Sequence, residues 1–364
     1  MITLHLDEQR GWRGGEQQAA YLIRGIVERG QKVLVSGKKG GIFLERLRGL
    51  PNCELVPMPF LGEWDLFTAS SLARLIRKRR VDIVHAHTSH THAIACLACW
   101  IARRGKVVVT RRVDFAPSRN WFTRWKYSRA DCIVAISGCI RQVLEQYGVA
   151  PNKIRVIYSA QDPRRLDVTP SKLEDLELPK DSRVLICPAA LVGHKDHATL
   201  LSAMKLVVKE NPQVHLLLAG EGDLRSQIET QIGQLGLQAH VHLLGYRNDV
   251  PQLIRRADIF VLSSKMEGLG SALIEAMFCG TPIVACAAGG IPEVVQHEET
   301  GLLVPVGDAS GLAKALLRLL HDVDLARAMA ERAREFAEKH FHVDHMVSEY
   351  LEIYNELLRK QKEG

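Results

Sequence analysis

Residues 257–280 read ADIFVLSSKMEGLGSALIEAMFCG, and this stretch decides the fold around it. The apolar run Ile259–Leu262 predicts a short buried strand, and the pattern that begins at Ser271 predicts a helix. Gly268 and Gly270, which lie between the two, allow the backbone to bend tightly and to approach a ligand without interference from a Cβ atom. The N-terminus of the helix offers unpaired N–H groups and a positive dipole end, which favour a phosphate. The stretch therefore predicts a strand, a ligand-binding loop and a helix.

Two glutamates flank this glycine bend. Glu275, expected in the first turn of the helix, can accept hydrogen bonds from a vicinal diol such as a ribose. Glu267, before the bend, is expected to face whatever is attached to the phosphate. The simpler alternatives are that Ser271 only caps the helix and that Glu275 is only solvated. A lone Gly-x-Gly is a weak signal, but two glutamates around it at a strand end favour a ligand site.

Short β-branched runs alternate with amphipathic helical patterns along most of the chain, which predicts βαβ units and parallel sheets covered on both faces. Strands are expected at 32–36, 83–85, 107–110, 132–136, 154–158, 184–187, 215–219, 241–244, 259–262, 282–285 and 301–304. Helices are expected at 17–29, 71–78, 138–147, 197–210, 223–235, 309–321 and 340–362.

A polar, proline-containing segment at residues 163–180 separates two series of these units. It predicts two Rossmann-like domains, at residues 1–163 and 164–340, followed by a C-terminal helix at 341–364 that packs back towards the first domain. In such α/β folds ligands bind beside the carboxyl ends of the strands, so the site is expected in strand-to-helix loops.

The 364 residues are 46% hydrophobic and 24% charged, which is typical of a globular protein and excludes fibrous, disordered and disulfide-scaffold classes. Charge is uneven along the chain. Residues 1–160 hold 26 basic and 12 acidic residues, a net charge of +14, whereas the remainder holds 22 basic and 29 acidic residues, a net charge of −7. This asymmetry favours an anionic partner for the first half, either nucleic acid, an anionic membrane face or an acidic acceptor. A merely solvated basic face is the simpler alternative.

The longest apolar stretch, residues 92–102, is too short to span a bilayer, and the first residues lack the pattern of a secretory signal. We therefore expect a cytoplasmic protein, or one on the cytoplasmic side of a membrane. Cys96 and Cys99 form a CxxC inside this apolar stretch. A buried pair of small hydrophobic side chains is favoured there over a redox or metal site.

Glu267 and Glu275 have the E-x7-E spacing found in retaining glycosyltransferases of family 4, which have the two-domain GT-B fold, and the chain resembles that family. The resemblance is most specific over residues 184–308, and it extends more loosely over the first 160 residues. The matching motifs are AGEGDL at 219–224, LGYRNDVPQLIRRADIFVLSS at 244–264, EGLGSALIEAMFCGTPIVACAAGGIPEVV from Glu267, GLLVPVGD at 301–308, and DIVHAH and ADCIVAIS in the first half. The fold that the resemblance implies is two Rossmann-like domains facing each other across a deep cleft, with the acceptor on the first domain and a nucleotide-sugar donor on the second.

The resemblance also implies roles for individual residues. Glu275 is expected to bind the ribose hydroxyls of the donor, and Glu267 to face the transferred sugar. Lys195 matches the lysine that neutralises the diphosphate, and it is the second candidate catalytic residue. The other candidate donor-binding positions are the loop and helix start at Gly268, Leu269, Gly270 and Ser271, the base-binding stretch from Tyr246 to Val250, and the first-domain glycine loop at Gly14 and Gly15.

The chain departs from the family pattern at two places. Ala190 occupies the position where the family often has an arginine, so Arg111 or Arg112 from the first domain is a candidate replacement for that charge. Arg112 also stands where the family often has a histidine that contacts the donor sugar. We take Arg112 as donor-binding and His90, from HTSHTH, as the third candidate catalytic residue.

The histidines at 85, 87, 90 and 92 resemble a metal site at first sight, and His85 and His87 are expected on one face of a strand. No carboxylate or thiolate joins them at ligand spacing, so polar residues lining the cleft, or satisfied structural histidines, are favoured over a metal. Basic stretches that contain tryptophan, such as NWFTRWKYSR at 120–129, favour an anionic membrane surface over single-stranded nucleic acid.

Together these features predict a retaining glycosyltransferase that needs no metal or cofactor and uses a UDP- or GDP-sugar. Its acceptor is expected in the cell envelope, a lipopolysaccharide core or another glycolipid or polysaccharide. It is expected to lie peripherally on the inner face of the cytoplasmic membrane and not to bind nucleic acid. Two alternatives remain: a nucleotide-sugar epimerase on the same fold, and a non-catalytic protein that binds nucleotide sugars or polyanions.

Overall fold

The computed structural model describes residues 1–173, 176, 178–179 and 181–363. They divide into two compact units, one formed by Met1–Ala160 with the segment from Val343 onward, and the other by Gln161–His342. The boundary expected after residue 163 falls after residue 160, and the C-terminal segment separates after residue 342 and not after residue 340. Within the expected divide, residues 174–175, 177 and 180 lie outside the described residues.

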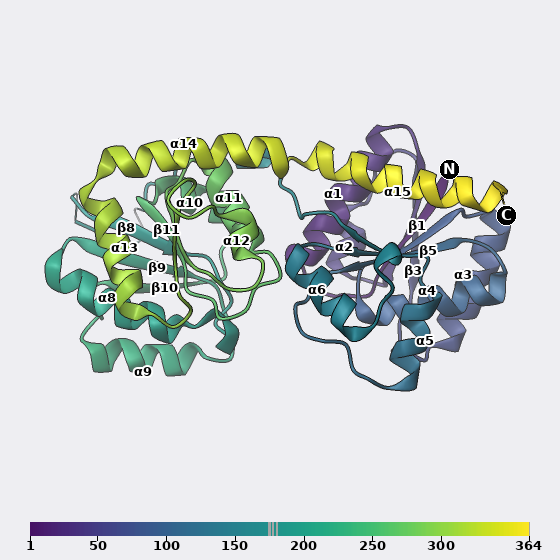
Figure 1. Ribbon diagram of the computed structural model, residues 1–364, viewed down its shortest axis with the longest axis horizontal. Coiled ribbons are helices and arrows are strands. Elements are labelled where there is room, and N and C mark those ends of the chain that lie inside the picture. Colours follow the sequence, from purple (N-terminus) through teal and green to yellow (C-terminus); the bar gives the residue numbers. More distant parts are fainter. Residues whose placement is uncertain (174–175, 177, 180, 364) are drawn as a thin grey trace. The chain divides into compact units, whose positions relative to one another are not determined.

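The first unit contains a seven-stranded parallel sheet with the strand order β3-β2-β1-β4-β5-β6-β7 (Figure 1). Between β1 and β4 the direction of strand addition reverses, and loops on either side of such a point diverge to leave room for a ligand. The strands are β1 Ile2–Asp7, β2 Lys32–Lys38, β3 Cys53–Met58, β4 Ile83–Ala86, β5 Lys106–Arg111, β6 Cys132–Ala135 and β7 Ile154–Val156.

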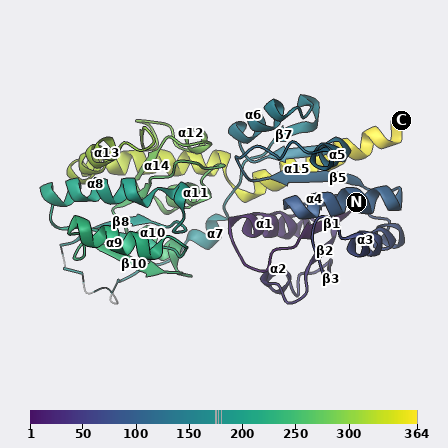
Figure 2. The ribbon, with the colours of Figure 1, turned by 90° about the horizontal axis from the view of Figure 1, so that it is seen from below.

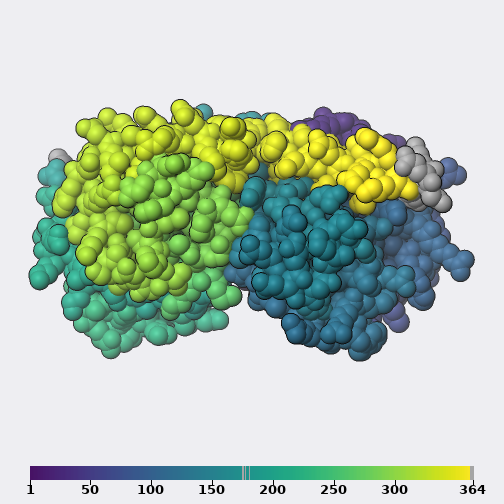
Figure 3. Space-filling model, viewed as in Figure 1, coloured from purple at the N-terminus to yellow at the C-terminus, as the bar shows by residue number. Residues whose placement is uncertain are grey.

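Helices cover the sheet of the first unit, and the C-terminal helix α15 is one of them (Figure 2). It packs against α1, where a Cβ at Gly25 would lie within 3.0 Å of Val347, so the two helices approach closely. In Figure 3 the yellow atoms of α15 lie directly against blue atoms of the same unit. The helices are α1 Gly14–Glu28, α2 Ile42–Arg46, α3 Leu66–Arg79, α4 Ser89–Ala102, α5 Trp121–Arg129, α6 Gly138–Tyr147, the short η1 Pro151–Lys153, and α15 Val343–Glu363.

The second unit contains a six-stranded parallel sheet with the order β10-β9-β8-β11-β12-β13, and its strand order reverses between β8 and β11. Helix α13 packs with α8, while α10 and α14 pack with α11. The strands are β8 Arg183–Cys187, β9 Val214–Ala219, β10 Val241–Gly245, β11 Ile259–Leu262, β12 Ile283–Cys286 and β13 Leu302–Val304. The helices are α7 Pro163–Leu166, η3 Gly193–Lys195, α8 His197–Glu210, α9 Arg225–Leu235, α10 Val250–Arg256, α11 Ser271–Cys279, α12 Ile291–Val294, α13 Ala309–His321 and α14 Val323–His340.

The expected strands are all present, with ends shifted by at most two residues, but β1 and β3 are additional. Strand β1 lies inside the sheet although it carries Thr3 and His5, whose side chains are fully buried. These polar groups are tolerated because His5 Nε2 and Thr3 Oγ1 lie 3.2 Å apart and hydrogen bond. Helices outside the expected set are α2, α4, α5, α7, α10, α12 and α14. The helix expected from residue 340 begins at Val343, because α14 extends to His340. Among the described helices, none is both long enough and apolar enough to cross a membrane.

Candidate functional site

Two loops at the carboxyl edge of the second sheet bring Lys195 and Glu267 together. Lys195 ends the short turn η3 after β8, and Glu267 lies in the loop after β11. The Lys195 ammonium pairs with Glu267 Oε1, which also accepts a hydrogen bond of 3.0 Å from the Ser264 hydroxyl. The lysine side chain is 19% exposed and the glutamate 12%. The pair is therefore largely shielded from water, so each of its charges would interact strongly with a ligand group that separates the two.

Further hydrogen bonds fix these two loops to each other. The Ser263 hydroxyl donates to the carbonyl oxygens of Lys195 and Asp196, both at 3.0 Å. The backbone N–H of Lys265 donates to the carbonyl of His194 at 2.8 Å, and its ammonium pairs with Asp196 Oδ1 at 3.1 Å. The loop residues between β11 and α11 are thus tied to the turn after β8 by one backbone hydrogen bond and by side-chain contacts of Ser263 and Lys265, which position the Lys195–Glu267 pair.

Helix α11 begins directly beside this pair. Its N-cap residue is Gly270, whose φ of +85° lies in the left-handed region that favours glycine. No side chain of the described residues caps this end. The Leu273 N–H donates to the Gly270 carbonyl at 2.9 Å, so the N–H groups of Ser271 and Ala272 are the ones that the helix start offers to a ligand. Leu269 is buried, whereas Gly268, Gly270 and Ser271 are partly exposed. This arrangement can bind a phosphate through backbone N–H groups and the helix dipole.

The glycine pair Gly289–Gly290 supports the loop from behind, a feature that sequence reasoning missed. A Cβ at Gly289 would lie within 3.0 Å of the Glu267 carbonyl oxygen, and one at Gly290 within 3.0 Å of the Gly268 carbonyl oxygen. The backbone N–H of Gly290 donates to the Glu267 carbonyl at 2.9 Å. In the sequence this feature is visible only as the doubled glycine in CAAGGIPE. Its role follows only from the fold, which places the Glu267 and Gly268 carbonyls against it.

Glu275 lies one turn further along α11 than expected, in the second turn and not the first. Its Oε1 accepts a hydrogen bond of 3.1 Å from the Gln161 side-chain amide, which also donates to the Ser271 carbonyl at 3.3 Å. Burial raises the pKa of Glu275, and the Arg165 charge and the Gln161 hydrogen bond oppose that rise. Gln161 was not singled out from the sequence, because residues 161 and 275 meet only in the folded unit.

The expected base-binding stretch is open to solvent. Tyr246 is 66% exposed and follows Gly245, the last residue of β10. Val250, the first residue of α10, is partly exposed. Between them Arg247 and Asp249 pair with each other at 2.7 Å. Most of the Tyr246 surface is therefore exposed and accessible to an incoming ring system.

In the first unit, Gly14 and Gly15 begin α1, after β1 and its connecting loop. A Cβ at Gly15 would lie 3.5 Å from Arg112 Cδ, so Arg112 lies directly over the start of this helix. The Arg112 guanidinium donates to the His87 carbonyl at 3.0 Å and lies 3.4 Å from His87 Nδ1. The structure thus brings together Arg112 and the glycine loop, which the sequence analysis named separately as donor-binding candidates, and it adds His87 as the partner of Arg112.

Arg111 and His90 occupy different surroundings from Arg112. Arg111 is buried and donates to the Tyr127 hydroxyl at 2.8 Å and to the Phe115 carbonyl, so its charge is turned inward and it is a poor substitute for a missing phosphate ligand. The His90 side chain is 54% exposed, and its Nδ1 lies 3.4 Å from Glu8 Oε1. Glu8 also accepts a hydrogen bond from the Thr88 hydroxyl. His90 is therefore accessible, with a carboxylate partner that the sequence did not suggest.

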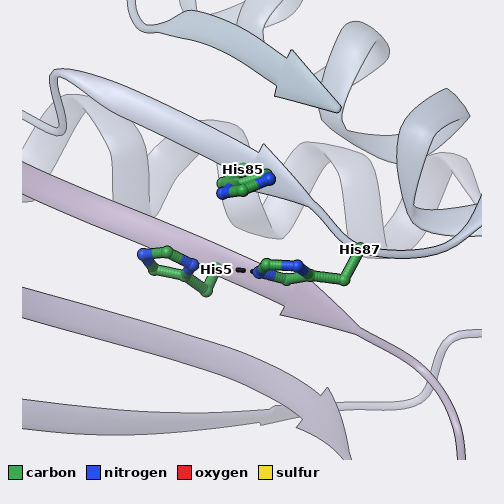
Figure 4. A group of neighbouring side chains, drawn as sticks. All are labelled: His5, His85 and His87. Carbon is green, nitrogen blue, oxygen red and sulfur yellow. Dashed lines mark hydrogen bonds between the residues drawn. The ribbon is translucent and has the colours of Figure 1, made fainter. Parts of the chain in front are cut away.

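His85 and His87 do lie on one face, as expected, but the third member of their group is His5 and not His90 or His92 (Figure 4). One ring nitrogen from each of the three lies within 4.8 Å of the others, which is close enough for all three to bind one metal ion. Hydrogen-bond partners account for all of the ring nitrogens, however: Thr3 and His87 for His5, Tyr354 and Thr110 for His85, and His5 and Arg112 for His87. An ion would have to replace several of these bonds, so the group fits a hydrogen-bond network better than a metal centre.

Comparisons with known proteins identify the family of the chain. The family Glycosyltransferase Family 4 matches residues 12–165, and Glycosyl transferases group 1 matches residues 168–336. The chain is 33% identical to N-acetyl-alpha-D-glucosaminyl L-malate synthase of Bacillus anthracis, over 83% of this chain and 81% of that protein. It is 26% identical to the lipopolysaccharide core biosynthesis glycosyltransferase LpsE of Rhizobium meliloti, over 93% of this chain and 95% of that protein.

Among solved structures, the crystal structure of Anabaena Alr3699/HepE in complex with UDP superposes with a TM-score of 0.85. The match is 26% identical in sequence and covers 98% of this chain and 100% of that one. Family matches to both halves, a relative above 30% identity and a whole-chain structural match all agree. The chain belongs to glycosyltransferase family 4 and is a glycosyltransferase with the GT-B fold.

Proposed function

We propose that this enzyme transfers a sugar from a nucleotide-sugar donor to an acceptor of the cell envelope, with retention of the anomeric configuration and without a metal ion. The observation that carries the proposal is the shielded Lys195–Glu267 pair beside the uncapped N-terminus of α11. A cation and a helix N-terminus suit a diphosphate, and a carboxylate next to them suits the hydroxyls of the attached sugar. UDP-sugars are the first donors to test, because the Alr3699/HepE structure is a complex with UDP, and GDP-sugars are the second.

The proposed chemistry follows from the charge that the reaction creates. The bond between the anomeric carbon and the phosphate oxygen breaks, and the acceptor oxygen forms the new bond to that carbon from the same face. The acceptor proton passes to the departing phosphate oxygen. Lys195 and the N–H groups of Gly270 and Ser271 stabilise the negative charge on the nucleoside diphosphate, the role that Mg²⁺ has in other transferases. Glu267 orients the sugar and stabilises its developing positive charge.

Other residues complete the proposed donor site. Glu275 binds the ribose, in place of its present bond to Gln161, and Tyr246 and Val250 border the base. From the first unit, Gly14, Gly15 and Arg112 act on the donor, and His90 is proposed as the catalytic group nearest the acceptor. No cofactor takes part.

The proposed acceptor is a lipopolysaccharide core or another glycolipid or polysaccharide. LpsE, which covers nearly the same length as this chain, is named for lipopolysaccharide core biosynthesis, which supports this class. An acceptor carried by a lipid brings the enzyme to a membrane. We therefore propose a peripheral position on the cytoplasmic face of an anionic membrane, with the basic first unit as the contact.

An exposed aromatic surface on the first unit supports this membrane contact. Leu61 and Trp64, in the loop after β3, are 81% and 59% exposed, and Trp121, the first residue of α5, is 70% exposed. The centroid of the Trp64 ring lies 5.8 Å from that of Trp121, so the loop after β3 and the start of α5 form one surface. The exposed Arg119 and Arg124 flank Trp121 in the sequence. Indoles favour the bilayer interface and arginines bind anionic headgroups.

Vesicle sedimentation tests the membrane contact. The wild-type chain is expected to sediment with anionic vesicles and not with neutral ones, with binding weakened by salt. The double variant W64A/W121A is expected to lose about thirtyfold in binding, because each indole contributes on the order of 1 kcal/mol at the interface. W100A is the matched control, since Trp100 is 63% exposed on α4. Equal binding by the two variants would contradict the proposed surface.

The transferase activity is tested by incubating the purified chain with UDP- and GDP-sugars and a bacterial glycolipid extract, and measuring nucleoside diphosphate release. We expect release that depends on the extract and survives EDTA, and that E267Q reduces it at least about 100-fold. E210Q, at the exposed end of α8, is the control. Conversion of the donor without extract would indicate an epimerase, and binding without release would indicate a non-catalytic protein.

A further inference from the structure

Three buried histidines lie beneath Arg112 in the first unit. His5 is on β1, His85 on β4 and His87 directly after β4, and each is at most 5% exposed. The rings of His5 and His87 are stacked with centroids 5.3 Å apart, and those of His85 and His87 are 4.2 Å apart (Figure 4). We call His5, His85 and His87 the histidine cluster.

The direction of the hydrogen bonds through this cluster follows from Arg112. A guanidinium has donors and no acceptor, so it must donate to His87 Nδ1, and that nitrogen carries no proton. His87 Nε2 therefore carries the proton of the neutral ring and donates to His5 Nδ1, 3.0 Å away. By the same rule His5 Nε2 carries the proton and donates to Thr3 Oγ1 at 3.2 Å. One chain of donors runs from Arg112 through His87 and His5 to Thr3.

The C-terminal helix closes the cluster from its other side. His85 Nδ1 lies 2.6 Å from the Tyr354 hydroxyl, and His85 Nε2 lies 2.7 Å from Thr110 Oγ1. Thr110 Oγ1 is in turn 2.9 Å from the Tyr350 hydroxyl. Both tyrosines belong to α15, so His85 and, through ring contact, His87 are fixed by residues from the far end of the chain.

Because its partners, the His87 ring and the His87 carbonyl, carry no charge, Arg112 is oriented without being neutralised by them. A carboxylate at this position would neutralise the guanidinium, whereas a neutral imidazole and a carbonyl orient it and leave its charge for an anion. Burial lowers the pKa of His87 well below its usual value, and His85 and the Arg112 charge lower it further, so this ring is neutral near pH 7. Arg112 also lies over Gly15 at the start of α1, where a phosphate is proposed to bind.

We propose that His87 and His5 are positioning residues, which hold the Arg112 guanidinium, oriented by uncharged hydrogen-bond partners, against the donor diphosphate. This inference rests on the proposed function, because it assigns Arg112 to the donor. It adds a role for two residues that contact neither donor nor acceptor themselves. It also gives α15 a part in the site, since the helix fixes the cluster from behind.

Nitrogen-15 NMR of histidine rings in the ligand-free chain tests the network without any donor. We expect His87 and His5 both as the neutral Nε2–H tautomer near pH 7, with shifts that do not change when Zn²⁺ is added. A protonated Nδ1 on either ring, or stoichiometric zinc with displaced shifts, would overturn the inference. Because this measurement needs no activity, it is independent of whether the proposed donor is correct.

Kinetics then test the positioning role. H87L removes the side-chain acceptor for Arg112 and leaves the backbone carbonyl of residue 87. H87N keeps a side-chain acceptor, since an asparagine oxygen can take the place of Nδ1. We expect H87L to raise the KM for the donor about tenfold, the loss of one hydrogen bond to a charged group, and H87N to restore most of it. H92L is the matched control, because His92 lies buried in the same unit. Among the described residues, the only hydrogen-bond partner of its ring is the Lys126 carbonyl.

H92L is expected to leave the donor KM within about twofold even if it lowers the melting temperature as much as H87L does. Equal KM values for H87L and H92L would reduce the histidine cluster to a structural role and overturn the inference. If instead R112A leaves donor binding unchanged while the NMR tautomers are as expected, the proposed donor role of Arg112 fails and the network stands.

Discussion

At the scale of single residues, the Lys195–Glu267 contact carries the proposed chemistry. Removing the lysine takes away the charge that stabilises the leaving diphosphate and leaves Glu267 with only Ser264 as a side-chain partner among the described residues. We expect K195A to lower kcat/KM by about 100- to 1000-fold, whereas K195R retains a larger share of the activity because it keeps the charge. Steady-state kinetics with a fixed donor measure both. Similar losses in the two variants would show that geometry, and not charge, is what Lys195 supplies.

Asp7, at the end of β1, predicts a pH-dependent stability. Burial, together with the nearby charges of Glu16 and Glu8, raises the pKa of Asp7 to about 7. The hydrogen bond from the Gln9 N–H and the charge of Arg112 oppose this rise. Asp7 Oδ2 has no hydrogen-bond partner among the described residues. The native state therefore retains a proton that the unfolded state has lost between about pH 4 and 7. The contribution of Asp7 to stability falls as the pH rises through that window and is constant above it.

The variant D7N is neutral at every pH and keeps an acceptor for the Gln9 N–H. It is expected to be more stable than the wild type by about 2–4 kcal/mol at pH 8 and nearly equal to it at pH 3.5. Urea unfolding at the two pH values measures the difference. If D7N gains the same free energy of unfolding at pH 8 and at pH 3.5, the ionisation of Asp7 does not destabilise the folded chain.

At the scale of elements, the loop from β11 to α11 depends on the glycines behind it. In G290A the new Cβ would lie within 3.0 Å of the Gly268 carbonyl and displace the loop from its present position. We expect a loss of about 2–4 kcal/mol in stability and at least tenfold weaker donor binding. G233A is the control: it lies in α9 with nothing closer than 3.9 Å, and alanine there is expected to stabilise the helix slightly. Unchanged donor binding in a folded G290A would contradict the account of this loop.

The same scale shows why parts of the fold and the site could be predicted from the sequence. Strands in parallel sheets are apolar runs, and the residues from Glu267 to Glu275 are contiguous, so both are visible in one dimension. Strand β1 was missed because its buried Thr3 and His5 are polar and are satisfied only by partners in the folded unit. Gly289, Gly290, Gln161 and His5 were missed for a related reason, since each acts on residues distant in sequence.

At the scale of the whole molecule, two units are formed by different parts of the chain. Each presents its candidate residues at the carboxyl edge of a parallel sheet. The first unit is completed by α15, whose Val347, Tyr350 and Tyr354 are part of its hydrophobic core. The sequence predicted the two domains and a terminal helix, but the core that α15 enters could not be read from helical periodicity alone.

Titration calorimetry with UDP, and with GDP in parallel, tests most directly whether the α11 loop is the nucleotide site. The wild-type chain is expected to bind one of the two nucleotides with a 1:1 stoichiometry, and E275A to bind it at least about tenfold more weakly, because a buried carboxylate no longer accepts from the ribose hydroxyls. The account would be contradicted if E275A bound the nucleotide as tightly as the wild type does, or if the wild type bound neither UDP nor GDP.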